Sequence, residues 1–148
     1  MSRNRPVIAI DGPVGAGKST AARALARALG YTYLNTGAMY RAVAIAAREA
    51  GVSPGADDLE ARLAPILVSI RIEFNGERVL LGGRDVTAQA AEPAIGDLAS
   101  RLSAIGAVRA KMRQMQRAAG EQGGVVMEGR DIGTVVFPDA EFKFYLDA

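Results

Sequence analysis

The residues best suited to chemistry form a glycine-rich run near the N-terminus, Gly12-Pro13-Val14-Gly15-Ala16-Gly17-Lys18-Ser19, which matches the pattern G-x-x-x-x-G-K-[ST]. Glycines let backbone N–H groups close around phosphate oxygens, the lysine adds a positive charge, and the serine hydroxyl can bind Mg²⁺. The alternative is a glycine-rich turn that only caps a helix, but a chance match is on the order of 1%. We therefore predict a phosphate-binding P-loop from Gly12 to Thr20.

The flanking segments have the character that this motif requires. Val7 to Ile10 is a short apolar run that predicts a buried parallel strand, and Lys18 to Leu29 predicts a helix with Gly30 as its C-terminal cap. Ala21, Leu25 and Leu29 share one face of that helix.

Further strands and helices follow in alternation. Tyr31 to Leu34 predicts a strand and residues 38–50 a helix, while Val125 to Met127 and Phe142 to Leu146 predict two more strands. This order is typical of an α/β fold with a mostly parallel sheet flanked by helices.

The middle of the chain interrupts this alternation. We expect a short helix within 57–64, a strand across 66–74, a turn at Asn75-Gly76 and a strand at 79–81, which together predict a small antiparallel insert. Helices over about 94–103 and 107–119 lead back to the sheet.

Ligands of open α/β sheets gather at the carboxyl ends of the strands, so the residues that follow each strand are the next candidates. Thr36, Gly37 and Arg41 open a helix and would form a second anion site. The alternative is an N-cap threonine followed by an arginine that only faces solvent.

Three charged residues follow the strand at Val125. Glu128 has the position of the acidic residue that holds Mg²⁺ in P-loop proteins, so we predict Ser19 and Glu128 as the metal-binding pair. Arg130 and Asp131 would point toward the same edge, and the alternative is that these two form a local ion pair.

Composition excludes several function classes. The 148 residues contain no cysteine and no histidine, which rules out thiolate nucleophiles, disulfides and imidazole bases. The apolar run at Val7 is too short for a signal peptide, no segment reaches membrane-spanning length, and the cations are scattered among acids. We expect a cytoplasmic monomer with no membrane or nucleic-acid partner.

At this point several motifs together resemble one family. They are Ile10-Asp11-Gly12-Pro13 with the P-loop, Thr36 to Arg41, Leu81-Gly82-Gly83-Arg84-Asp85-Val86-Thr87, Val108-Arg109 with Gln116-Arg117, and Gly129-Arg130-Asp131-Ile132-Gly133-Thr134-Val135-Val136-Phe137-Pro138. Nearly the whole chain resembles bacterial cytidylate kinases, and the last motif is highly specific. The resemblance implies a P-loop, nucleoside monophosphate kinase-like fold that transfers phosphate from ATP to CMP or dCMP with Mg²⁺.

The resemblance also implies residue roles. Thr36, Gly37, Arg41 and Arg130 would bind the acceptor phosphate, and Ser100, Arg109 and Asp131 would read the base. Cytosine offers an amino donor that a carboxylate accepts, and two acceptors that an arginine and a serine can satisfy. The catalytic set would be Lys18, Arg41, Arg130 and Asp131. Without the family, Ser100 and Arg109 could equally be ordinary polar helix positions.

The resemblance further implies one kinase domain with a core of residues 1–35 and 120–148 and an acceptor-binding region of about 36–119. The chain departs from the family at Asn35, Gly83 and Ala91, where family members commonly carry Asp, Asn and Arg. It also stops at Ala148, before the family's C-terminal lid, final strand and helix. The alternatives are a truncated nucleotide-binding fragment with little turnover, and a kinase for another small acceptor.

Overall fold

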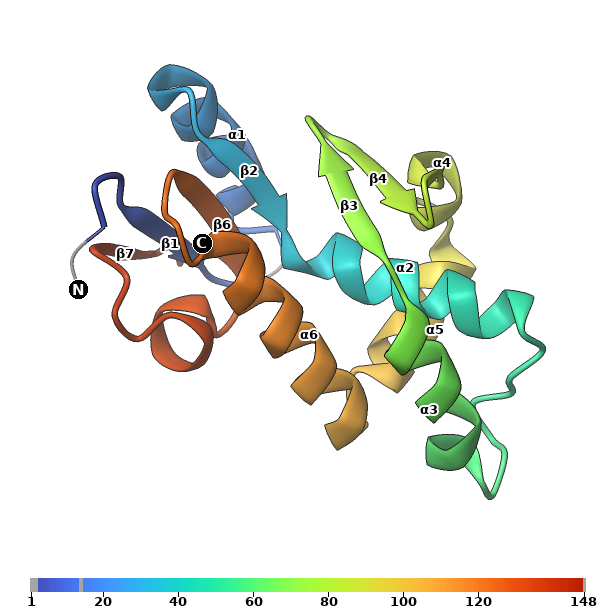
Figure 1. Ribbon diagram of the computed structural model, residues 1–148. Coiled ribbons are helices and arrows are strands. Elements are labelled where there is room, and N and C mark those ends of the chain that lie inside the picture. Colours follow the sequence, from blue (N-terminus) through green and yellow to red (C-terminus); the bar gives the residue numbers. More distant parts are fainter. Residues whose placement is uncertain (1–2, 14, 148) are drawn as a thin grey trace. The chain divides into compact units, whose positions relative to one another are not determined.

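A computed structural model describes residues 3–13 and 15–147. The chain divides into two compact units, which are described separately: unit 1 comprises residues 1–36 and 113–148, and unit 2 comprises residues 37–112. Figure 1 shows the course of the chain through both units. Within the described residues, no helix has the length and apolar character needed to cross a membrane.

Unit 1 is built on a parallel sheet. Its strands are β1 (Val7–Asp11), β2 (Thr32–Asn35), β6 (Val125–Gly129) and β7 (Phe142–Tyr145), in the order β2-β6-β1-β7. All three strand pairs are parallel, which confirms the predicted sheet type. The two central strands, β1 and β6, are buried along their whole length, including the acids Asp11 and Glu128 near their carboxyl ends. The carboxyl ends of all four strands therefore lie at one edge.

Helix α1 (Lys18–Leu29) covers one face of this sheet and has the predicted bounds. Gly30 ends it in the left-handed conformation, with φ of 69°. Leu29 is 44% exposed, and the helix buries Ala22 and Ala26 against Ile8, Ile10 and Val126, with Leu25 at the margin. Two alanines let the helix approach the sheet closely, which larger side chains would prevent.

On the opposite face, Met127 of β6 and Phe137 lie against Gly120, the last residue of α6 (Gly106–Gly120). Phe137 is fully buried and follows a π-helical turn, η1 (Ile132–Val136), that the sequence did not predict. A Cβ atom at Gly120 would lie 2.9 Å from the Phe137 ring, so the glycine is what lets the ring sit against the helix.

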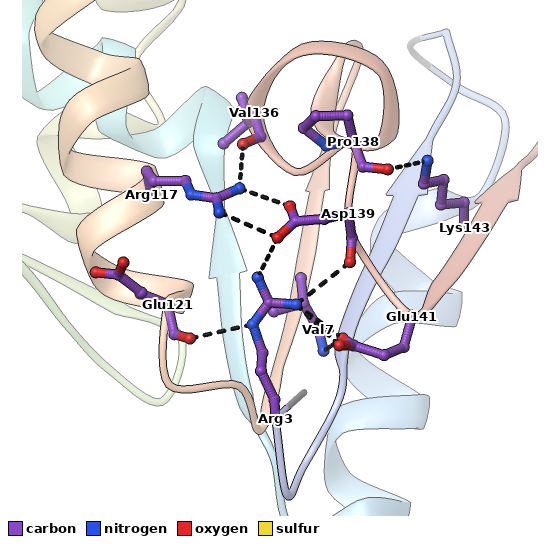
Figure 2. Close-up of polar contacts among 9 residues, drawn as sticks. All are labelled: Arg3, Val7, Arg117, Glu121, Val136, Pro138, Asp139, Glu141 and Lys143. Carbon is purple, nitrogen blue, oxygen red and sulfur yellow. Dashed lines mark hydrogen bonds and ion pairs between the residues drawn. The ribbon is translucent and has the colours of Figure 1, made fainter. Parts of the chain in front are cut away.

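A network of charged side chains links the N-terminal segment, α6 and the turn before β7, as Figure 2 shows. Arg117 of α6 forms two hydrogen bonds with the Asp139 carboxylate, at 2.7 and 3.1 Å, and Arg3 pairs with the same carboxylate at 2.9 Å. Both guanidinium groups also lie over the Phe137 ring, 4.5 and 5.4 Å from its centre. Arg3 additionally contacts Glu141, which accepts a hydrogen bond from the Val7 amide at 2.8 Å. The N-terminal segment, α6 and the turn before β7 are thereby tied together.

Unit 2 contains helices and a small antiparallel sheet. The helices are α2 (Thr36–Glu49) from Gly37 onward, α3 (Leu59–Ser69), α4 (Thr87–Ala90), α5 (Pro93–Leu102) and the first turns of α6. The sheet pairs β3 (Ile72–Asn75) with β4 (Arg78–Leu81) and β4 with β5 (Arg84–Asp85), which confirms the predicted hairpin at Asn75-Gly76. The short strand β5 and helix α4 were not predicted.

One prediction in unit 2 was wrong. Residues 66–69, expected to begin a strand, belong to helix α3, which contains Pro65 in its interior. Proline removes one helical hydrogen bond and normally ends a helix. Here Leu63 and Leu67 are buried on either side of it, at 0% and 7% exposure, so packing of this face keeps the helix intact.

Candidate phosphate-binding site

The glycine-rich loop leads from the carboxyl end of β1 into α1, as the motif requires. Gly12, Gly15 and Gly17 have positive φ angles of 153°, 84° and 82°, which residues with a side chain rarely adopt. A Cβ atom at Gly12 would also lie 2.3 Å from the Leu146 carbonyl oxygen, so this glycine is required by the neighbouring backbone as well as by the loop. Val14, predicted to be part of the loop, lies outside the described residues.

The first turn of α1 carries the polar side chains of the motif. The Lys18 ammonium lies 3.5 Å from the Pro13 carbonyl and 4.0 Å from the Glu128 carboxylate, so it bends back over the loop. The Ser19 hydroxyl donates a hydrogen bond of 2.9 Å to Glu128 Oε2. Thr20, the next residue, is exposed. The structure thus brings together Lys18, Ser19 and Glu128.

Glu128 is a buried carboxylate, only 3% exposed, near the end of β6. Its second oxygen, Oε1, accepts a hydrogen bond from the Tyr33 hydroxyl of β2. Burial and, after it, this hydrogen bond raise the pKa of Tyr33, so the hydroxyl keeps its proton and remains a donor. Sequence reasoning missed Tyr33, because only the strand register shows which side chains face Glu128.

The Ser19–Glu128 pair fits a magnesium ion. A hydroxyl and a carboxylate are hard oxygen ligands, and Mg²⁺ is usually held by one or two protein groups together with phosphate oxygens and water. Elsewhere in the described chain, no group of three or more acidic, histidine or cysteine side chains gathers to form a self-sufficient metal site. The pair supplies two oxygen ligands, so a magnesium ion there would need further oxygen ligands to complete its coordination.

Asp11 is a second buried acid that sequence reasoning gave no role. It is 6% exposed, and its two carboxylate oxygens accept hydrogen bonds from the amides of Ile132 and Gly133, at 2.9 and 2.8 Å. These amides begin η1, directly after Arg130 and Asp131. Asp11 therefore fixes the backbone that carries those two predicted site residues. A polar residue that ends an otherwise apolar strand was the only signal in the sequence.

Thr36 is held at the same edge of the sheet. It is buried, and its hydroxyl donates a hydrogen bond of 2.8 Å to the Glu128 carbonyl. Gly129 leaves room for this contact, because a Cβ atom there would lie 2.6 Å from the Thr36 hydroxyl oxygen. Thr36 is thus fixed beside the strand end that carries Glu128.

Arg130 and Asp131 follow β6 but do not pair with each other among the described contacts. Arg130 is exposed, whereas Asp131 is half-buried and forms an ion pair of 3.5 Å with Arg113 of α6. The local Arg130–Asp131 ion pair, left open as an alternative from the sequence, is therefore not formed, and the Arg130 side chain is accessible.

The remaining predicted residues belong to unit 2. Gly37 and Arg41 lie in the first two turns of α2, and the Arg41 side chain is half-buried. Ser100 on α5 and Arg109 on α6 are both exposed. Arg41, Ser100 and Arg109 are on helices, as predicted, and Gly37 also belongs to α2, which begins two residues earlier than the predicted helix.

The chain is similar in sequence to a known protein family over almost its whole length. The family model described as cytidylate kinase matches residues 8–148. The chain belongs to the cytidylate kinase family. It is 49% identical over 146 residues to the cytidylate kinase of Pelodictyon phaeoclathratiforme, covering 99% of this chain and 63% of that protein. It is 53% identical to the cytidylate kinase of Syntrophotalea carbinolica, covering 96% of this chain and 61% of that protein.

A longer relative contains the same region. The chain is 47% identical to the bifunctional pantoate ligase/cytidylate kinase of Prochlorococcus marinus over all of its own length and 29% of the relative's. The chain therefore spans somewhat less than two thirds of the length of the single-function cytidylate kinases that it matches. The parallel sheet flanked by helices, with its small antiparallel sheet, is the P-loop fold expected of this cytidylate kinase family member.

Proposed function

We propose that this chain transfers the γ-phosphoryl group of ATP to CMP or dCMP, giving ADP and CDP or dCDP. The observation that carries the proposal is the grouping of the Lys18 ammonium, the Ser19 hydroxyl and the buried Glu128 carboxylate at the P-loop. This grouping offers a cation and a metal-binding pair to donor phosphates. The family match over residues 8–148 supports cytidine nucleotides as acceptors.

The reaction needs no general base from the protein. An oxygen of the CMP phosphate is already ionised and attacks the γ-phosphorus of ATP, while the bond between that phosphorus and the β–γ bridging oxygen breaks and ADP leaves. Catalysis then consists of alignment and charge stabilisation. Mg²⁺, when bound by Ser19 and Glu128, would neutralise the phosphate oxygens of the donor.

Each predicted residue has a role in this proposal. The loop from Gly12 to Thr20 would bind the ATP phosphates, with Lys18 as the cation that stabilises the transferred group. Thr36, Gly37, Arg41 and Arg130 would hold the acceptor phosphate, and Arg41 and Arg130 would add charge in the transition state. Ser100, Arg109 and Asp131 would read cytosine.

The wider setting is part of the same proposal. ATP and cytidine nucleotides are cytoplasmic metabolites, which supports a cytoplasmic location. The monomeric state and the absence of a nucleic-acid partner stay predictions. Size-exclusion chromatography with light scattering would measure the oligomeric state.

The test is release of ADP, followed with a coupled assay in the presence of ATP, Mg²⁺ and CMP. We expect turnover that requires CMP, that is lost in Lys18→Ala, and that persists in the matched control Lys111→Ala on α6. Comparison of CMP, UMP and AMP fixes the acceptor, and a preference for AMP would contradict the proposal. Binding of ADP and CMP without turnover would instead identify the chain as a nucleotide-binding fragment.

A further inference from the structure

The carboxylate of Glu128 is held at both oxygens. Oε2 accepts the hydrogen bond from Ser19 at 2.9 Å and lies 4.0 Å from the Lys18 ammonium. Oε1 accepts the hydrogen bond from the Tyr33 hydroxyl. One oxygen therefore faces the P-loop side chains, and the other is bonded to a residue that sequence reasoning assigned to no site.

The strand register explains how Tyr33 reaches this carboxylate. In the parallel β2–β6 pair, Tyr33 lies opposite Val126 and Asn35 lies opposite Glu128. Side chains two positions apart on a strand share a face, so Tyr33 and Glu128 are diagonal neighbours on the face that α1 covers. A tyrosine is long enough to span this diagonal.

The Tyr33 ring is itself fixed by packing. It is half-buried against the cluster formed by Ile8, Ile10, Val126 and the two alanines of α1. Because the core sets the ring's position, the hydroxyl reaches the carboxylate from a fixed point. It also donates a hydrogen bond without placing a positive charge beside the carboxylate, as lysine or arginine would.

We infer that Tyr33 is a positioning residue that holds Glu128 Oε1 so that Oε2 faces the Ser19 hydroxyl, where the divalent cation of the bound nucleotide is held. The inference rests on the proposed function for the identity of that nucleotide. Groups that orient a metal ligand typically change metal affinity about 10-fold to 100-fold when they are removed. Because the Glu128 carboxylate would keep its hydrogen bond to Ser19, we expect the loss of metal affinity to lie at the lower end of that range.

The test measures metal binding directly. Mn²⁺ is titrated into the protein–ADP complex, and the free ion is followed by electron paramagnetic resonance. We expect Tyr33→Phe to weaken Mn²⁺ binding about 10-fold and to leave ADP affinity without metal unchanged. The matched control is Tyr31→Phe, because Tyr31 packs against the same cluster, whereas the described hydrogen-bond partners of the Glu128 carboxylate are Ser19 and Tyr33.

A double-mutant cycle separates positioning from packing. In a Glu128→Gln background, Tyr33→Phe should have no further effect on Mn²⁺ binding, since the carboxylate that it orients is gone. An equal loss in both backgrounds, or wild-type Mn²⁺ affinity in Tyr33→Phe, would overturn the inference. Thermal melting of every variant shows whether the fold is retained, and the cycle still applies at a temperature where all are folded.

The readout uses neither CMP nor turnover. A chain that binds Mn²⁺ with ADP but does not phosphorylate CMP would contradict the proposed function and leave the role of Tyr33 standing. Conversely, CMP phosphorylation with normal metal affinity in Tyr33→Phe would contradict only the inference. Failure of the wild-type chain to bind Mn²⁺ with ADP would contradict both.

Discussion

The buried Asp11 carboxylate holds the backbone that follows the predicted site residues Arg130 and Asp131. A buried carboxylate is costly unless hydrogen bonds compensate it, and here two backbone amides do so. Both amides belong to η1, the turn that immediately follows Asp131. The side chain at the end of β1 thus determines the backbone path after β6, on a neighbouring strand.

We expect Asp11→Asn to lower the free energy of unfolding by about 2 kcal/mol, because an amide can accept only one of the two hydrogen bonds and turns its NH₂ group toward the other amide. Urea unfolding followed by circular dichroism measures the change. Asp97→Asn, at an exposed position of α5, removes the same charge and should change stability by less than about 0.5 kcal/mol. Similar small losses in both variants would show that the η1 amides do not depend on Asp11.

Only some residues of the candidate site could be predicted from the sequence. A local motif and the ends of strands predicted Lys18, Ser19 and Glu128, and the structure brings these three together. Tyr33 could not be found in that way, and Asp11, although it ends the first strand, received no role from the sequence. Their contacts depend on the register of paired strands and on a π-helical turn, neither of which leaves a periodic signal in the sequence.

Among the helices, bounds set by local sequence signals were predicted, whereas bounds set by tertiary packing were not. Helix α1 has the predicted bounds because its ends are set by local signals, the P-loop before it and Gly30 after it. Helix α3 was predicted to end before Pro65, but burial of Leu63 and Leu67 carries it on to Ser69. Local signals thus predicted the first element, and tertiary packing decided the second.

The charged network around Phe137 gives an element-scale prediction. The hydrogen bonds from Arg117 foremost, and also those from Arg3, hold the pKa of Asp139 well below its usual range (Figure 2). A carboxylate whose folded-state pKa is depressed stabilises the fold above its unfolded pKa of about 4, and this contribution is lost as the pH falls below that value. The Asp139 side chain is 51% exposed, so screening limits the contribution to about 1 kcal/mol.

We therefore expect Asp139→Asn to destabilise the protein by about 1 kcal/mol at pH 7, and the difference from wild type to shrink progressively as the pH falls below about 4. Urea unfolding at a series of pH values measures it. Asp57→Asn, an exposed carboxylate in unit 2, serves as the control and should show little change at any pH. A pH-independent loss in Asp139→Asn would assign the effect to packing rather than to charge.

At the scale of the whole molecule, the proposed roles are distributed unequally over the two units. Every residue proposed to bind ATP and Mg²⁺, from the P-loop to Glu128, belongs to unit 1. The proposed acceptor residues belong to both units: Thr36, Arg130 and Asp131 to unit 1, and Gly37, Arg41, Ser100 and Arg109 to unit 2. Donor and acceptor binding should therefore respond differently to substitutions in unit 2.

Arg109→Ala tests this difference. Loss of a charged hydrogen-bond donor to the base should weaken CMP binding about tenfold or more, while ADP affinity stays within about twofold, since the donor residues are in unit 1. Isothermal titration calorimetry with each nucleotide measures both values without requiring turnover. The matched control is Arg101→Ala, which removes an exposed arginine from α5 of the same unit and should leave both affinities unchanged. Equal losses of CMP affinity in the two variants would mean that unit 2 attracts the nucleotide through its general positive charge, and that Arg109 does not read the base.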